Sequence, residues 1–212
     1  MQLAEERDEV IAIARRMIDD GLVVGTSGNV SVRSGDLIAV TPSGVDYDRM
    51  RAEDVPVVDL DGAVVDGALK PTSEMPMHLA AYRAHEAGAV VHTHSLHATA
   101  LSLLRDEVPA VHYQLADFGG PVRVAEYATF GTEALAESVS TALRDRTGGI
   151  LRNHGTITIA DALPKAYARA AQLEWICQLW LTAARVGDPR LLPDGELERC
   201  APMFRAYGQQ PG

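Results

Sequence analysis

The sequence has few of the features that mark extracellular, membrane or redox proteins. Its two cysteines, Cys177 and Cys200, lie far apart and match neither a disulfide framework nor a metal or redox spacing. The N-terminus carries acids in place of the basic start and apolar run of a signal peptide. No apolar stretch approaches the roughly 20 residues of a membrane-spanning helix. These absences predict a cytoplasmic protein with no membrane partner.

Positive charge is scarce as well. The formal net charge is −10, which argues against a nucleic-acid partner because a phosphate backbone favours a basic face. Only Lys70 and Lys165 are lysines, and neither lies in the apolar surroundings that activate a Schiff-base lysine. The chain also lacks the glycine-rich motifs of dinucleotide-binding and P-loop proteins.

The chain is long enough for one substantial core, and its hydrophobic content of 47% predicts a single domain over residues 1–212. Hydrophobic periodicity and turn residues predict helices over 3–19, 73–87, 95–104, 132–146, 161–185 and 194–205. They predict strands over 29–33, 36–40, 55–60, 89–91, 110–115, 121–127, 148–154 and 156–160. Ser73 and Thr132 are expected to be N-caps. This mixture predicts a layered α/β fold with a largely antiparallel sheet.

The segment VVHTHSLHA, residues 90–98, holds three of the seven histidines. Residues two apart on a strand face one side, so His92 and His94 project together. They could supply two of the three protein ligands of a catalytic zinc ion, or could be sheet-surface histidines that bind water. His154 follows another apolar strand and precedes Gly155, which leaves space beside the imidazole. It is the best candidate for the third ligand, and its alternative role is that of a turn histidine.

The other histidines are predicted to be structural. His97 would lie on the helical side of the bend, and His112 would lie in a separate strand. His78 and His85 share a helix face with Tyr82, a pattern more typical of packing or solvation than of a metal site.

Three loops rich in glycine and hydroxyl side chains suggest an anion site. They are residues 25–29, 41–44 and 71–73. Each loop alone is also typical of an ordinary turn, but the third opens a helix, whose dipole favours negative charge. Glu74 follows that loop. Its carboxylate could simply complement the helix dipole, or it could abstract a proton from a carbon next to a carbonyl group.

Taken together, these motifs resemble the class II aldolase and adducin N-terminal family, and look most like its L-fuculose 1-phosphate aldolases. The motifs are GTSGNVSVR (25–33), TPSG (41–44), KPTSEMPMH (70–78), VVHTHSLHATALS (90–102) and NHG (153–155). The similarity also includes residues 112–139 and MFRAYG (203–208), so it extends nearly end to end. It implies a three-layer α/β/α fold with a central, mostly antiparallel sheet.

The resemblance implies roles for individual residues. The implied zinc ligands are His92, His94 and His154. Glu74 would be the catalytic carboxylate, able to approach the metal in the substrate-free state. Tyr113 would be an acid delivered from the neighbouring subunit of a homotetramer with active sites at its subunit interfaces, and Tyr207 would cover the site. The implied phosphate-binding residues are Thr26, Gly28, Asn29, Ser43, Gly44, Thr72 and Ser73. Of these, Thr26 and Gly28 would shape the first loop.

The implied activity is a zinc-dependent retro-aldol cleavage of a ketose 1-phosphate. The substrate would be L-fuculose 1-phosphate or a related deoxyketose 1-phosphate, and the products dihydroxyacetone phosphate and an aldehyde such as lactaldehyde. Zn²⁺, or another divalent metal, would stabilise the enediolate. Glu74 would move the proton at the enediolate carbon, and Tyr113 would exchange the proton on the aldehyde oxygen.

Three alternatives stay open at this point. Methylthioribulose 1-phosphate dehydratases of the same family keep the three histidines and the glutamate. Pentulose-phosphate 4-epimerases carry an aspartate where this chain has Glu74. A non-catalytic, adducin-like interaction module would need none of the ligand, base and phosphate positions, all of which are filled here.

Overall fold

One mixed sheet of eight strands runs through the part of the chain that the computed structural model describes, residues 1–205. The strands are β1 (Asn29–Ser34), β2 (Leu37–Val40), β3 (Val57–Asp59), β4 (Val64–Asp66), β5 (Ala89–Thr93), β6 (Val124–Ala125), β7 (Gly148–Leu151) and β8 (Gly155–Ala160). Their spatial order is β4-β3-β2-β1-β5-β8-β7-β6. Only the β6–β7 pair is parallel among these described strands. The largely antiparallel sheet confirms the predicted fold class.

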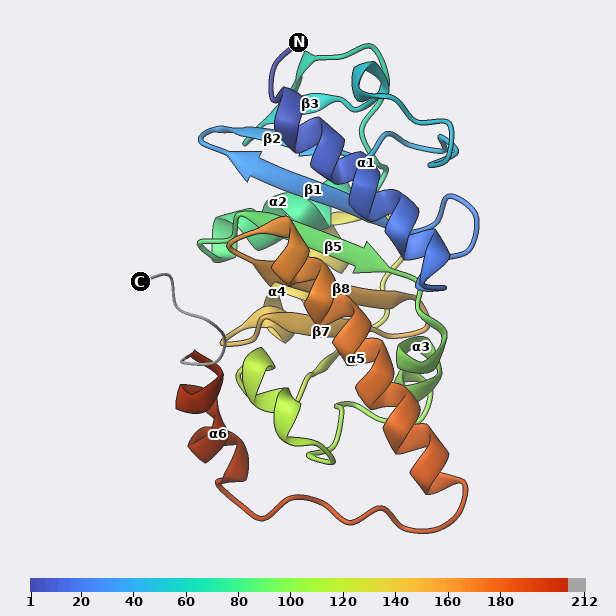
Figure 1. The fold of residues 1–212 in the computed structure, drawn as a ribbon, viewed down its shortest axis with the longest axis vertical. Helices are drawn as coiled ribbons and strands as arrows, with labels where there is room; N and C mark the ends of the chain where they lie inside the picture. The colour runs from blue at the N-terminus through green and yellow to red at the C-terminus, as the bar shows by residue number, and fades with distance from the viewer. Residues whose placement is uncertain (206–212) are drawn as a thin grey trace.

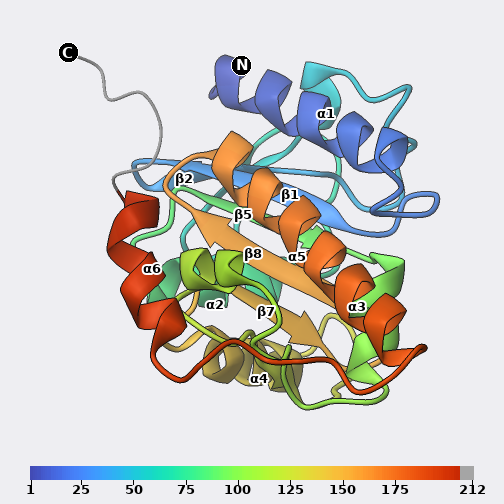
Figure 2. The same cartoon turned by 60° about the horizontal axis from the view of Figure 1, so that its bottom comes forward.

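Helices cover both faces of the sheet. They are α1 (Ala4–Asp19), α2 (Met75–Ala84), α3 (Leu96–Ser102), α4 (Glu133–Leu143), α5 (Leu163–Ala184) and α6 (Glu196–Arg205). Helices α1 and α5 cross one face, and α2 and α4 lie behind the other (Figures 1 and 2). None of the helices in residues 1–205 has both the length and the apolar character that a bilayer crossing requires.

The alternation of side chains along the central strands decides which residues face which layer. Val30 and Val91 pack in the core beneath α1 and α5, whereas Val90 packs in the core beneath α2 and α4. Because neighbours on a strand point to opposite faces, Asn29 and His92 project toward the α2 and α4 layer. These two residues are direct cross-strand partners of β1 and β5. Polar residues of the two strands therefore meet on one face.

The sequence prediction was wrong at three strands. Residues 110–115 form no strand, and residues 113–115 begin the 3-10 helix η2 (Tyr113–Phe118), whose backbone is capped by the His112 ring and by Gly119 in the left-handed region. The predicted strand over 121–127 is reduced to the two residues of β6. Strand β4 was missed because Val64 and Val65 are both exposed, so no alternation of burial marks this edge strand.

Helix starts were predicted unevenly. The Thr132 hydroxyl accepts a hydrogen bond from the Leu135 N–H, which confirms that cap. Ser73 is not a cap, because α2 begins at Met75 and its N-cap residue, Glu74, makes no side-chain cap hydrogen bond. Instead the Thr72 hydroxyl accepts from the Glu74 N–H at 3.2 Å.

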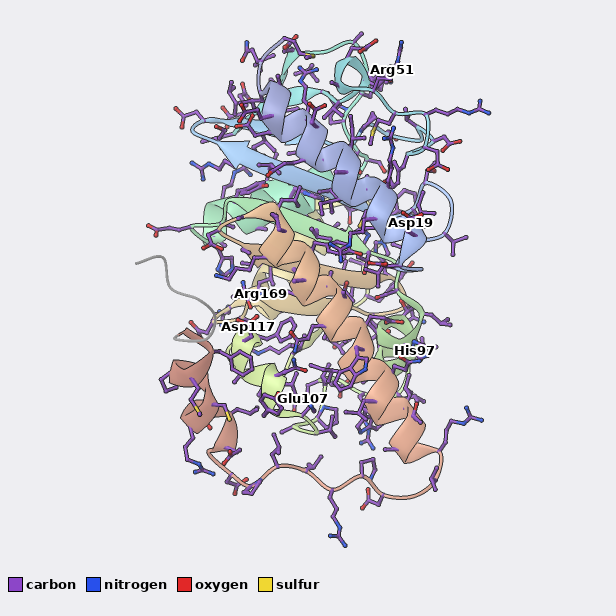
Figure 3. All side chains as sticks on the ribbon, in the orientation of Figure 1. Asp19, Arg51, His97, Glu107, Asp117 and Arg169 are labelled. Carbon is purple, nitrogen blue, oxygen red and sulfur yellow. The ribbon has the colours of Figure 1, made fainter. Side chains whose placement is uncertain are left out.

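A largely buried ion pair fixes η2 against α5. Arg169 of α5 points toward Asp117 of η2 in Figure 3, and its Nε and Nη2 donate to the two carboxylate oxygens at 3.0 Å each. Its Nη1 donates to the Ile159 carbonyl at 2.7 Å, so the guanidinium also reaches β8. This pair anchors the element that begins with Tyr113.

Candidate active site

Strand pairing brings the predicted metal ligands together. Strand β8 pairs with β5, so the turn that precedes β8 lies beside the end of β5. His92 and His94 stand at that end of β5, and His154 stands in the turn. Glu74 approaches from the residue before α2. Residues from three separate parts of the chain thus meet at one end of the central strands.

The contact distances define a compact cluster of four side chains. His92 Nε2 lies 3.1 Å from Glu74 Oε2, and His154 Nε2 lies 3.2 Å from Glu74 Oε1. His94 Nε2 lies 3.0 Å from His92 Nε2. One ligand atom from each of the four residues falls within 4.8 Å of all the others. The structure therefore brings the three predicted ligands and the predicted catalytic carboxylate to one point.

Three features of the cluster fit a divalent metal ion. His92 Nδ1 lies 2.8 Å from the Thr156 carbonyl oxygen and must donate to it, which leaves the Nε2 lone pair for a ligand. Burial, with the neighbouring imidazoles of His92 and His154, lowers the pKa of His94 to about 3, so its imidazole is neutral. Glu74 Oε1 is buried and has no hydrogen-bond partner within residues 1–205. Three imidazoles and a carboxylate form a donor set that suits zinc.

The Glu74 carboxyl group is ionised despite its burial. Burial raises its pKa, but the adjacent imidazoles of His92 and His154 and the hydrogen bond from Asn29 outweigh it and hold the pKa well below the ordinary value. The amide of Asn29 donates to Glu74 Oε2 at 2.9 Å. A carboxylate held in this form can accept a proton from a bound molecule.

A cavity of about 380 Å³ opens beside the cluster. Glu74, His94 and His154 form one part of its wall. The wall also contains every predicted phosphate residue, namely Thr26, Gly28, Asn29, Ser43, Gly44, Thr72 and Ser73. Among the described residues that line it there is neither lysine nor arginine. An anion in this cavity would be held by hydroxyls, N–H groups and the start of α2.

Aromatic residues of the cavity wall were missed from the sequence. Tyr47 is buried and donates from its hydroxyl to the Gly28 carbonyl at 2.5 Å, which braces the first loop. Tyr127 and Phe130 are exposed and also line the cavity. The sequence shows these two residues as an aromatic pair in a polar segment. They were not identified because Tyr127 was assigned to the predicted strand over 121–127.

Tyr113, the predicted acid, does not join the cluster within its own chain. Tyr113 is half-exposed and lines a different cavity, where its ring stacks on that of Phe204 with centroids 5.9 Å apart. Tyr207 lies outside the described residues.

Two histidines predicted to be structural make contacts away from the cluster. His97 Nδ1 lies 2.7 Å from a carboxylate oxygen of Glu174, which also accepts from the backbone at the start of α3. His112 caps η2 and does not lie in a strand, contrary to the prediction.

The lack of a side chain at Gly155 permits a close backbone contact. The left-handed residue of this turn is Asn153, with φ 58°. A Cβ on Gly155 would overlap the carbonyl oxygen of Thr93 and approach the backbone of His94. The missing side chain therefore allows β8 to lie against the end of β5, which sets the distance between His94 and His154.

The sequence of most of the chain matches the model of one protein family. The model of the class II aldolase and adducin N-terminal domain matches residues 8–181. The chain belongs to this family. The class II aldolases are metal-dependent lyases, and the chain is an enzyme of this class.

Named relatives within the family match along nearly the whole chain. A 5-deoxy-D-ribulose 1-phosphate aldolase from Bacillus thuringiensis serovar kurstaki is 42% identical, over 99% of this chain and 100% of the relative. An L-fuculose phosphate aldolase from Escherichia coli K12 is 40% identical, over 92% of this chain and 95% of the relative. A solved L-fuculose 1-phosphate aldolase has a TM-score of 0.93 at 37% identity, with 97% and 98% of the two chains covered. The fold is therefore that of the class II aldolases.

The close approach at Gly155 generates a test of the metal centre. Gly155→Ala is expected to lower zinc affinity at least about tenfold, because the new Cβ would push the turn that carries His154 away from His94. The same strain should lower the Tm by roughly 4 °C or more. Gly187→Ala is the matched control, since a Cβ there meets nothing within 4 Å. Zinc titration and thermal unfolding of both variants measure the effect, and wild-type zinc affinity in Gly155→Ala would contradict it.

Proposed function

We propose that this enzyme is a zinc-dependent aldolase that cleaves a ketose 1-phosphate to dihydroxyacetone phosphate and an aldehyde. The substrate would be L-fuculose 1-phosphate or a related deoxyketose 1-phosphate. The observation that carries the proposal is the position of Glu74, which lies between three histidines and a cavity walled by the predicted phosphate residues. A sugar phosphate held by those loops would present its carbonyl end to the cluster.

The proposed substrate classes combine this geometry with the names of the relatives. The two curated relatives described above are named for 5-deoxy-D-ribulose 1-phosphate and L-fuculose phosphate. Both sugars are deoxyketoses, so they would offer the same phosphate and enediolate and differ in the aldehyde that leaves. Tyr127 and Phe130 are exposed aromatic residues of the cavity wall and would contact that variable end.

His92, His94 and His154 would hold the divalent ion. When bound, the ion supplies positive charge that stabilises negative charge developing at the substrate's carbonyl oxygen. The phosphate loops would fix the position of the substrate and so turn binding energy into orientation.

The proton transfers are assigned to two residues, most simply written in the direction of bond formation. Ionised Glu74 removes a proton from the carbon next to the carbonyl of dihydroxyacetone phosphate, and the enediolate so formed attacks the aldehyde carbon. A new carbon–carbon bond forms, and the aldehyde oxygen takes the electron pair. Tyr113 donates its phenolic proton to that oxygen. Cleavage runs through the same steps in reverse.

Because Tyr113 does not line the cavity of its own chain, we propose that a neighbouring subunit of a homotetramer provides it. The exposure of its ring leaves it accessible to a second copy. We also propose that residues 1–212 form a single domain, since the described strands belong to one sheet. The cytoplasmic location stays a prediction.

The alternatives are less well supported. Lys70 is exposed, and Lys165 is exposed and paired with Asp161 at 3.2 Å, so neither offers the desolvated amine of a Schiff-base aldolase. The glutamate at position 74 argues against a 4-epimerase. A methylthioribulose 1-phosphate dehydratase would use the same cluster, and product analysis separates it from an aldolase.

The first test is a substrate panel. The zinc-loaded protein, incubated with L-fuculose 1-phosphate, 5-deoxyribulose 1-phosphate and 5-methylthioribulose 1-phosphate, is expected to release dihydroxyacetone phosphate from at least one of them. A chelator should abolish this release and added zinc should restore it, since the metal charge is needed for catalysis. Loss of water without carbon–carbon cleavage would identify a dehydratase. Cleavage that survives complete metal removal would exclude the proposed chemistry.

The second test concerns the base. Glu74→Gln keeps the size of the side chain but removes its basicity, so cleavage should fall by about 10²- to 10⁴-fold. Zinc should stay bound, because the three histidines are unchanged. Glu9→Gln, an exposed site on α1, is the control. Wild-type turnover in Glu74→Gln would remove this residue from the mechanism.

The third test concerns the acid and its subunit of origin. Tyr113→Phe should slow cleavage by about 10²-fold or more, because the phenolic proton is lost. Co-assembly of Tyr113→Phe subunits with Glu74→Gln subunits should restore activity to about a quarter of wild type, since some interfaces then combine an intact base with an intact acid. A mixture no more active than its components would show that the acid does not come from another subunit.

A further inference from the structure

A buried row of polar side chains leads from Glu74 into the interface between α2 and the sheet. Glu74 Oε2 is 2.9 Å from Asn29 Nδ2, and Asn29 Oδ1 is 2.5 Å from His78 Nε2. His78 Nδ1 is 2.7 Å from the Ser31 hydroxyl, which is 2.8 Å from the Tyr82 hydroxyl. No member is more than 6% exposed. None of the proton transfers proposed above uses His78, Ser31 or Tyr82.

Secondary structure explains why these residues meet. Asn29 and Ser31 are two apart on β1 and so share the face that α2 covers. His78 and Tyr82 are four apart on α2 and so share the side that faces β1. The row is therefore built from two elements whose packing is fixed by the surrounding core, including Leu79.

The orientation of the Asn29 amide sets the direction of every hydrogen bond in the row. Its nitrogen lies 2.9 Å from Glu74 Oε2 and its oxygen lies 2.5 Å from His78 Nε2, so the amide donates to Glu74 and accepts from His78. His78 must then carry its proton on Nε2, and its Nδ1 must accept from the Ser31 hydroxyl. The Ser31 oxygen is left to accept from Tyr82. One arrangement of protons satisfies all of these groups.

The titration state of the row supports the same arrangement. Burial, with the nearby His92 imidazole, lowers the pKa of His78 to about 3, so the ring has one proton at neutral pH. Burial raises the pKa of the Tyr82 phenol above its ordinary value, so it keeps its proton and can donate.

The arrangement leaves one donor directed to the cavity side. The Asn29 NH₂ group has two N–H bonds, and within residues 1–205 only Glu74 accepts from it. Asn29 also lines the cavity. A reversed amide would set its oxygen against the Glu74 carboxylate, which places two acceptors in contact and removes the free donor.

We propose that His78 is a positioning residue that holds the Asn29 amide so that one N–H is donated to Glu74 and the other to an anionic oxygen of the substrate. The identity of that oxygen as a phosphate oxygen rests on the proposed function, whereas the orientation of the amide does not. His78 thereby couples the carboxylate to the anion-binding part of the cavity without touching either.

Two variants of His78 separate positioning from packing. In His78→Gln the side-chain nitrogen reaches the place of Nε2 and can still donate to Asn29, whereas the shorter His78→Asn cannot reach it. The probe is inorganic phosphate, titrated into the zinc-loaded protein. His78→Asn is expected to weaken phosphate binding about tenfold or more, the value of one hydrogen bond to a charged group, and His78→Gln to stay within about threefold of wild type. Equal phosphate affinity in His78→Asn and wild type would overturn the proposal.

A double-mutant cycle distinguishes this role from a general loss of structure. If His78 acts through Asn29, then His78→Asn added to Asn29→Ala should weaken phosphate binding by less than about twofold beyond Asn29→Ala alone. A merely structural role predicts that the two losses multiply, and that result would refute the coupling.

A final measurement needs no activity and no destabilising change. In wild-type protein with ¹⁵N-labelled histidine, NMR should show the His78 ring proton on Nε2 and slow to exchange with solvent, with the signal absent in His78→Gln. A proton on Nδ1 would contradict the deduced row whatever the substrate. Failure of the wild type to cleave any ketose phosphate would refute the proposed function and leave this measurement to decide on His78.

Discussion

The pairing of β5 with β8 is the contact on which the candidate active site depends. It places the turn that carries His154 against the strand end that carries His92 and His94, and Gly155 permits the approach because it lacks a side chain. The same pairing supplies the Thr156 carbonyl that accepts from His92 Nδ1 and so frees Nε2. Hydrogen bonds of the sheet thus decide both the spacing and the tautomer of the ligands, and the cluster needs no flexible segment to bring it together.

Glu74 links the cluster to the cavity. It is a buried anion, a state that is costly unless positive charge or hydrogen bonds surround it, and here His92 and the Asn29 amide contact one carboxylate oxygen and His154 the other. Since Asn29 is held in turn by His78, the carboxylate is supported by a network that reaches from the candidate metal site into the core beneath α2. The fold therefore stabilises charge at the position where the proposed chemistry would move a proton.

The sequence predicted the parts of this site that follow a local rule. The two-residue spacing of His92 and His94 predicted their common face, and the glycine- and hydroxyl-rich loops predicted the cavity wall. His154 was identified through the motifs around it, because one turn histidine carries no signal of its own. The row through His78 and Tyr82 could not be predicted, because the periodicity of α2 shows that they share a face but not that β1 presents Asn29 and Ser31 to it. Residues 110–115 were predicted to form a strand. The hydrogen bond by which the His112 ring caps η2 exists only in the folded helix, so the local sequence carries no signal of it.

The absence of lysine and arginine from the described cavity wall has a consequence for turnover. A phosphate bound there would be held by fixed dipoles, which reward correct placement but attract an anion from solution less strongly than full charges do. In the proposed reaction the phosphate group is the same before and after cleavage. Contacts that bind the phosphate of the substrate therefore also bind the phosphate of the product. Neutral hydrogen-bond donors can orient the sugar and still allow dihydroxyacetone phosphate to leave. Arginine side chains around the phosphate would slow this release.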